Sequence, residues 1–394
     1  MAKGYIRTYY FIEFFSTLSV SFFFATYAVF LFANGLNVMQ IGIIASISTA
    51  SVIIFEVPTG AFADSYGRKI SIIAGFVLIS VATGIYFISK SFEYFIVAEI
   101  IAGLGIVFVS GALDAWIVDS LRNKGPSESI GKIFARGMQA NQAGMILGSL
   151  SGAYIGSINI ALPWAASSLF CMSLAIICAF IMKEEYEICK KRKLMEIMKV
   201  ATEGIRFSIR NKDIMYVVFF GAAVFFSSKA LDIQWSLVFR YAYSLDMKYL
   251  GWIVVGFSLF MMAGAQVSIR LMKNIGINRR TIVLSQGLTI FGTLIASLML
   301  GVIPVLSGIF IQEIGRGAII PLRQAYFSKE GRIPSDKRAT VLSFDSMVLS
   351  IGGIFGLMAS GYLADAYSIS IAWMVSGLAL LICSIVFLRL QNGK

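Results

Sequence analysis

Apolar residues run along the chain in repeated stretches of roughly 20 residues, which is the length that crosses the hydrocarbon core of a bilayer. Charged or turn-forming residues bound each stretch, as expected for successive transmembrane helices. Twelve helices are predicted, over residues 8–34, 38–63, 70–89, 93–121, 134–157, 160–182, 214–243, 248–272, 281–300, 304–327, 339–363 and 369–390. We therefore expect an all-α integral membrane protein with twelve transmembrane helices.

Composition agrees with this fold class. Apolar residues make up 58% of the chain and charged residues 14%, whereas a soluble domain has roughly 45–50% and about 25%. The net charge is +12, and the chain has no histidine. In a soluble protein such a positive balance would suggest nucleic acid as a partner, so the positions of the basic residues decide its meaning.

Basic residues gather at the two termini and in alternate connections between the predicted helices. The opposite connections hold little beyond Lys90, Arg240 and Lys248. Because Lys and Arg concentrate on the cytoplasmic side of membrane proteins, we expect both termini in the cytoplasm and a bacterial-type inner membrane. The positive charge then reports topology, and no nucleic acid is expected. The first apolar stretch is too long for a cleavable signal peptide and is expected to remain as a helix.

The two halves of the chain resemble each other at an offset of 208–210 residues. Gly144 and Gly148 correspond to Gly352 and Gly356, and Tyr154 corresponds to Tyr362. This repeat predicts two pseudo-symmetric six-helix bundles, over 1–182 and 214–394. The connection 183–213 has apolar residues at helical spacing and is expected to be an amphipathic helix on the membrane surface, either a linker or a regulatory segment.

The predicted fifth helix carries a glycine at every fourth position. Such a stripe lets a neighbouring backbone approach closely. It indicates tight helix packing, a smooth surface on which the halves slide, or both. The stripe consists of Gly144, Gly148, Gly152 and Gly156.

The connection between the second and third helices reads GAFADSYGRK, from Gly60 to Lys69. It resembles the signature loop of the major facilitator superfamily, G-x-x-x-D, basic, x-G, basic, basic, and departs from it only at Ser65. With twelve helices and a half-chain repeat, this resemblance covers essentially the whole chain. The drug-exporting branch is the nearest in character.

The resemblance implies that this loop is a cytoplasmic latch. Asp64 would accept hydrogen bonds from the start of helix eleven, and Arg68 would pair with an acid at the end of helix four, for which Asp119 matches. The alternative is a basic turn that only sets topology. The latch residues implied are Gly60, Asp64, Gly67, Arg68, Lys69 and Asp119.

Other family features are absent. Proton antiporters of the family often carry Arg four residues before a G-x-G pair in helix four, but here Glu99 precedes Gly103 and Gly105. The proline of the antiporter motif in helix five is also missing. The direction of transport therefore stays open.

Charged residues inside predicted membrane helices need a reason, since each costs roughly 2.5–3.5 kcal/mol at the bilayer centre on insertion scales. Candidates for proton coupling are Asp114, Glu99, Glu313, Asp345 and Glu56. Glu56, like Glu13, lies near a helix end and has a structural bridge as its alternative. Asp345 faces either the cavity or the latch region.

A substrate cavity is expected to draw on charged, amide and aromatic side chains. Lys229 with Asp232, and Glu313 with Arg316, lie three residues apart on their helices and form either self-neutralising ion pairs or a switch that substrate or protons open. The cavity candidates are Glu13, Trp116, Asn141, Gln142, Lys229, Asp232, Trp235 and Arg316.

No catalytic or metal-binding pattern is present. The sequence has no Walker nucleotide loop, no Ser/His/Asp set and no metal-ligand spacing among its four cysteines, so no enzyme activity, cofactor or metal is expected. The prediction is a secondary active transporter, proton-coupled and exporting a lipophilic or cationic compound. The alternatives are proton-linked uptake of a polar metabolite, such as a sugar or carboxylate, and a non-transporting membrane sensor or enzyme. A monomer is expected because each chain contains both halves.

Overall fold

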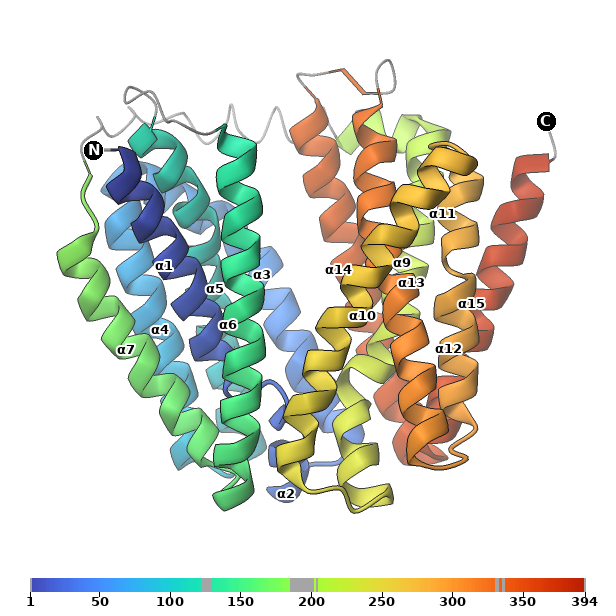
Figure 1. Ribbon diagram of the computed structural model, residues 1–394, viewed down its shortest axis with the longest axis horizontal. Coiled ribbons are helices and arrows are strands. Elements are labelled where there is room, and N and C mark those ends of the chain that lie inside the picture. Colours follow the sequence, from blue (N-terminus) through green and yellow to red (C-terminus); the bar gives the residue numbers. More distant parts are fainter. Residues whose placement is uncertain are drawn as a thin grey trace. The chain divides into compact units, whose positions relative to one another are not determined.

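The computed structural model describes residues 2–121, 129–184, 202, 205–329, 333–334 and 337–392. Regular structure in this part of the chain is helical, without strands (Figure 1). Most of the connection 183–213 falls outside the described residues, so the amphipathic helix expected there stays a prediction.

Seven helices form the first half of the described chain. They are α1 (Ala2–Ser21), α2 (Tyr27–Ala33), α3 (Val38–Tyr66), α4 (Arg68–Ile88), α5 (Phe92–Leu121), α6 (Ile130–Ile158) and α7 (Leu162–Ile181). The second half contains α9 (Lys212–Leu237), which continues as the π-helical turn η1 (Val238–Ala242), then α10 (Met247–Asn274), α11 (Arg279–Ser285), α12 (Gly287–Ser297), α13 (Val302–Ser328), α14 (Arg338–Ala366) and α15 (Ile369–Asn392).

Among the described residues, nine helical segments are long and apolar enough to cross a membrane, and each matches one of the twelve predicted spans. The other three predicted spans correspond to α1 with α2, to α6, and to α11 with α12. Two of these three contain a break. The expectation of continuous helices over 8–34 and 281–300 was therefore wrong.

The first break has a packing cause. Residues 22–26 form turns between α1 and α2, and the carbonyl of Phe22 lies where a Cβ atom on Gly152 would stand. The break thus brings the backbone of the first span onto the glycine stripe of α6. The second break is at Gln286, whose side-chain amide donates to the carbonyl of Gly315 on α13 (3.3 Å).

The chain divides into two compact units by its contacts. Unit 1 consists of Met1–Leu36, Ile47–Lys191 and Leu245–Val255, and unit 2 of Asn37–Ser46, Arg192–Ser244 and Gly256–Lys394. The division cuts through α3 and α10, since the first residues of each belong to the unit that holds the other half of the chain.

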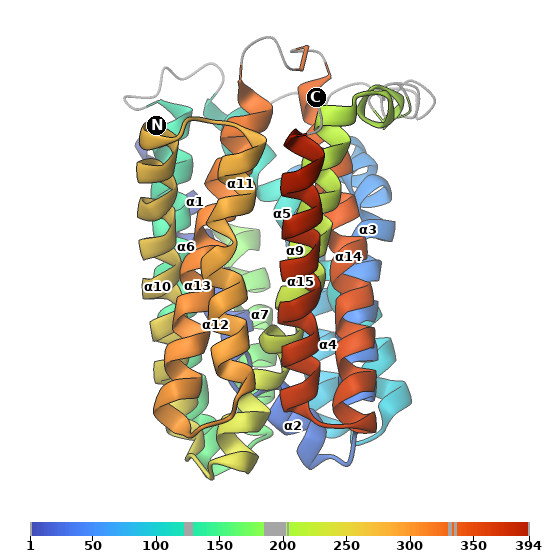
Figure 2. The ribbon, with the colours of Figure 1, turned by 90° about the vertical axis from the view of Figure 1, so that its right-hand side faces the viewer.

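Equivalent helices pack in equivalent ways in the two units. In unit 1, α1 packs on α6, and α4 packs on α5 and α7; in unit 2, α9 packs on α14, and α12 packs on α13 and α15 (Figures 1 and 2). These pairings give the half-chain repeat a three-dimensional meaning, because each corresponds to a pair at the same place in the other half.

The glycine positions show the repeat at atomic detail. A Cβ on Gly148 would stand 2.5 Å from the carbonyl oxygen of Leu18 in α1, and one on Gly356 would meet the carbonyl of Phe226 in α9. Both glycines and both carbonyls are separated by the same offset (356 − 148 = 226 − 18 = 208). The structure thus confirms the tight-packing interpretation of the glycine stripe, whereas sliding stays untested.

Candidate functional site

Unit 1 brings two of the predicted acids to neighbouring positions. The Tyr9 hydroxyl donates to Asp114 Oδ1 (2.9 Å), and the Asn141 amide donates to Glu13 Oε2 (3.1 Å). The residues come from α1, α5 and α6, where α6 is drawn close to α1 by its glycines. Asp114 is exposed and Glu13 is half-buried, so both carboxylates are held by neutral donors while remaining accessible.

Glu99 lies in a second place in unit 1, packed among aromatic rings. Only 7% of its surface is exposed. Two hydroxyls donate to its Oε1, from Tyr86 on α4 (2.6 Å) and from Tyr27 on α2 (3.0 Å). The Tyr86 ring stacks on Trp164 of α7 with 3.9 Å between centroids. Glu99 therefore ties together α2, α4 and α5 through phenolic hydroxyls.

Long stretches of the first six predicted spans carry acidic but no basic side chains. The sequence contains no Lys or Arg within 8–67, 70–89, 91–121 or 137–182. The acids in these ranges are Glu13, Glu56, Asp64, Glu93, Glu99, Asp114 and Asp119. Glu56 is exposed on α3, one residue before the exposed Val57. Gln142, beside Asn141, has a buried Oε1 without a hydrogen bond in the described structure.

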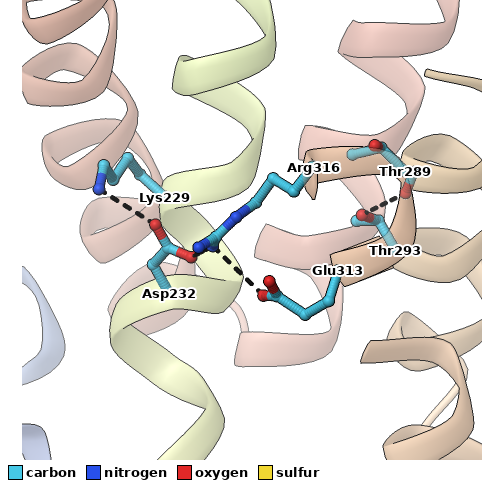
Figure 3. Close-up of polar contacts among 6 residues, drawn as sticks. All are labelled: Lys229, Asp232, Thr289, Thr293, Glu313 and Arg316. Carbon is cyan, nitrogen blue, oxygen red and sulfur yellow. Dashed lines mark hydrogen bonds and ion pairs between the residues drawn. The ribbon is translucent and has the colours of Figure 1, made fainter. Parts of the chain in front are cut away.

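Unit 2 contains the predicted ion pairs, joined into one network (Figure 3). Lys229 Nζ lies 3.0 Å from Asp232 Oδ2 on α9, and Arg316 Nη1 on α13 contacts both Asp232 Oδ1 and, at 3.3 Å, Glu313 Oε1. Arg316 is thus shared by two carboxylates from two helices. The second oxygen of Glu313 is buried and has no hydrogen-bond partner in the described part of the chain.

Asp345 on α14 forms a buried ion pair with Arg323 on α13, a partner that the sequence analysis did not single out. Both residues are nearly fully buried, with 4% of Arg323 and 8% of Asp345 exposed. The guanidinium occupies the place where a Cβ on Gly221 of α9 would stand. The two places expected for Asp345, the cavity and the latch region, stay predictions. Arg323 follows Arg316 by seven residues, so helical periodicity would have placed both on one face of α13.

The two candidate tryptophans are buried within their units. Trp116 has no exposed surface, and its Nε1 donates to the carbonyl of Lys183 (3.1 Å). Trp235 is 4% exposed and packs edge-on against Phe257. In this conformation both are core residues rather than cavity walls, and their contact with a substrate stays a prediction.

The loop of the family signature is organised around Arg68. Its Nη2 lies 2.5 Å from Asp64 Oδ1, and its Nε lies 3.7 Å from Asp119 Oδ2 at the end of α5. Gly67, with a φ of +103°, precedes α4, in the left-handed region that favours glycine. The carboxylate of Glu184 accepts from the Lys69 backbone N–H (2.7 Å), a partner that the sequence analysis missed although it directly follows the sixth span.

Comparison with known proteins decides the family. The model of the Major Facilitator Superfamily matches residues 9–247 and 217–393. The chain belongs to this superfamily. As a member it is a secondary transporter and a multi-pass membrane protein, not an enzyme. Membership also confirms the predicted twelve-helix fold class.

Relatives of this transporter include proteins that are named for drug resistance. It is 25% identical over 382 residues to the uncharacterized MFS-type transporter YxaM of Bacillus subtilis (strain 168), covering 94% of this chain and 92% of that protein. It is 24% identical over 313 residues to Multidrug resistance protein 2 of the same organism, covering 78% and 75%. The crystal structure of the nucleoside transporter NupG has the same fold, with a TM-score of 0.81 over 99% of this chain and all of NupG, at 12% identity.

Proposed function

We propose that this transporter exports lipophilic or cationic compounds in exchange for protons. The supporting observation is the charge of the first six spans, since residues 8–67, 70–89, 91–121 and 137–182 hold no Lys or Arg but include Glu13, Glu56, Glu99 and Asp114. A cation that enters such a surface gains attraction from every ionised carboxylate. A proton competes with the cation for the same carboxylates, and such competition is required if the transporter is to exchange cations for protons.

Asp114 is the residue proposed to couple the two. It accepts a hydrogen bond from the neutral Tyr9 hydroxyl, so proton uptake removes a charge without leaving a basic group unpaired. Its exposure allows both water and substrate to reach it. Glu13, held by Asn141, lies on the neighbouring helix and completes the proposed binding surface.

The carboxylates of unit 2 are proposed to have a different role. Asp232, Glu313 and Asp345 each contact an arginine, so protonating any of them leaves a positive charge less well compensated. They are suited to holding helices in place. The 24% identity to Multidrug resistance protein 2 supports drug-like substrates, and the distribution of charge supports proton exchange at the carboxylates of unit 1.

We propose that the protein acts as a monomer in a bacterial-type inner membrane, with both termini in the cytoplasm. Exchange of one proton for a monovalent cation moves no net charge and draws only on the pH gradient, whereas with a neutral substrate one charge moves through about 100 mV and supplies roughly 2.3 kcal/mol. This energy is sufficient for a substrate gradient of about 50-fold.

The test measures ethidium, a lipophilic cation, entering proteoliposomes with an acidic lumen. The parent accumulates ethidium only while the pH gradient lasts. Asp114→Asn abolishes this gradient-driven accumulation but retains exchange of labelled for unlabelled ethidium. Glu93→Gln, an exposed acid-to-amide change on the same helix, behaves like the parent.

Three results contradict the proposal. Undiminished gradient-driven accumulation by Asp114→Asn removes Asp114 from the coupling. A parent protein that carries sugars or carboxylates along a proton gradient, and not ethidium, favours uptake. Binding of solutes without flux of any of them favours a sensor.

A further inference from the structure

The beginning of α3 is held by a side chain from a distant part of the chain. Asp365, next to last in α14, accepts hydrogen bonds from the first two backbone N–H groups of α3, with Oδ1 at 3.0 Å from the Val38 nitrogen and Oδ2 at 2.8 Å from the Met39 nitrogen. All of these residues belong to unit 2, whereas α3 from Ile47 onward belongs to unit 1.

Local sequence leaves these two donors without a partner. The first N–H groups of a helix have no partner inside the helix and need a cap. Asn37 caps only the third, since its Oδ1 accepts from the Gln40 N–H (2.8 Å) while the Gln40 side chain accepts from the Asn37 N–H (3.0 Å). Asp365 supplies the acceptors that Asn37 and Gln40 do not, and its negative charge suits the positive end of a helix dipole.

Small residues bring the two backbones together around this cap. A Cβ on Gly42 would stand 2.6 Å from the carbonyl oxygen of Leu357, and one on Gly361 would stand 2.8 Å from the Cα of Met39. One turn further along α3, the Ser46 hydroxyl lies 3.4 Å from the carbonyl of Ile354. The contact is therefore a fitted interface between the start of α3 and the end of α14.

The ends of these two helices share a sequence pattern. α3 ends on Gly60-Ala-Phe-Ala-Asp64 and α14 on Gly361-Tyr-Leu-Ala-Asp365, each with glycine four residues before the aspartate. Asp64 is engaged by Arg68 in this structure, and the start of α14 has no side-chain cap. Of the two similar aspartates, Asp365 is the one that caps a helix of another segment.

We infer that Asp365 is a positioning residue that latches the start of α3 to α14, and that this latch opens during each transport cycle. An alternating-access transporter must expose its binding surface at each membrane face in turn. A contact of backbone glycines and one carboxylate can separate and re-form, because the released N–H groups and the carboxylate are all solvated by water.

The test uses Ser46 as a reporter. Ser46 is 5% exposed and covered by α14, so a cysteine placed there reacts with a water-soluble maleimide only when the start of α3 separates from α14. The protein is placed in nanodiscs with its native cysteines replaced by serine. A helix cap contributes about 0.5–2 kcal/mol, so Asp365→Ala is expected to raise the labelling rate at Ser46→Cys by about 2- to 30-fold. Asp365→Asn, which retains one acceptor oxygen, gives an intermediate rate.

Two controls separate release of the latch from general loosening. Asp246→Ala removes a cap made within one segment, in which the Lys248 N–H donates to Asp246 Oδ1 (3.0 Å), and leaves labelling at Ser46→Cys unchanged. Ser227→Cys, whose parent hydroxyl is buried between α9 and α15, labels equally slowly with and without Asp365→Ala.

Labelling of Ser46→Cys at the parent rate in both Asp365 variants overturns the inference. So does an equal rise at Ser227→Cys. The assay needs neither substrate nor a proton gradient, so its outcome is independent of the proposed exchange of cations for protons.

Discussion

Removing one partner of the buried Arg323–Asp345 pair is expected to destabilise unit 2 more than any change to a surface charge. The side chains are 5% and 11% exposed, so little solvent screens them. Breaking a buried pair by removing one charge costs about 3–5 kcal/mol, because the other charge stays buried without compensation. Asp345→Asn is expected to lower the free energy of unfolding by this amount near neutral pH, because the guanidinium of Arg323 keeps its charge.

Arg323→Gln leaves a carboxylate instead, and this difference gives the prediction a pH dependence. An ordinary aspartate has a pKa of about 3.9, so binding a proton at about pH 7 costs about 4 kcal/mol, and at about pH 5 about 1.5 kcal/mol. Because Asp345 can bind a proton and so lose its uncompensated charge, these two protonation costs are upper limits to the free energy of unfolding that Arg323→Gln removes. The destabilisation by Arg323→Gln therefore shrinks as the pH falls.

The assay is reversible unfolding in mixed detergent and SDS micelles, applied to both single variants and to the double variant. Replacing a buried pair by neutral groups is often nearly neutral, so the double variant should lose far less than the two single losses combined. The control is Asp213→Asn, which breaks a pair with Arg279 (2.8 Å) whose aspartate is 57% exposed and which is worth about 0–1 kcal/mol. The reasoning would be refuted if each single variant lost no more stability than this control and if the two losses simply added in the double variant.

Two further predictions follow from the packing of α6 and from the network of unit 2. Gly148→Leu places a side chain against the Leu18 carbonyl and should abolish the monodisperse peak in size-exclusion chromatography. Gly111→Leu, whose side chain meets open space, should keep that peak. Equal behaviour of the two variants would contradict the proposed role of the glycine stripe. Arg316→Met leaves two carboxylates without their shared partner and should lower the thermal unfolding midpoint more than Lys229→Met, which leaves the arginine in place; the reverse order would be inconsistent with a network centred on the arginine.

The spans were predictable because each is decided by its own composition. A run of roughly 20 apolar residues has to be helical in a bilayer, since no water is present to satisfy its backbone. The breaks at 22–26 and at Gln286 were not predictable in this way. Each is stabilised by a contact with a distant helix, the first at Gly152 and the second at Gly315. The apolar pattern runs through the first, and the short polar stretch Ser285-Gln286 at the second is too brief to end a span.

The types of the site residues were also predictable, but not their partners. The pairs at i and i+3 follow from helical geometry, and both Lys229–Asp232 and Glu313–Arg316 are present. Periodicity assigns residues to a face of a helix without saying which helix that face meets. The contact of Arg316 with Asp232, which joins α13 to α9, could therefore not be derived from spacing alone.

The partners sort the candidate acids in a way that their positions in the sequence did not. Asp345 and Glu313 ranked with Asp114 as proton-coupling candidates because all lie within spans. The structure sets the first two beside arginines and leaves Asp114 with a tyrosine hydroxyl. A proton that binds beside an arginine exposes that arginine to the low-dielectric interior, whereas one that binds beside a hydroxyl exposes nothing. The proposed proton coupling is therefore assigned to the carboxylates of unit 1, and among these to Asp114, which combines a neutral donor with access to water.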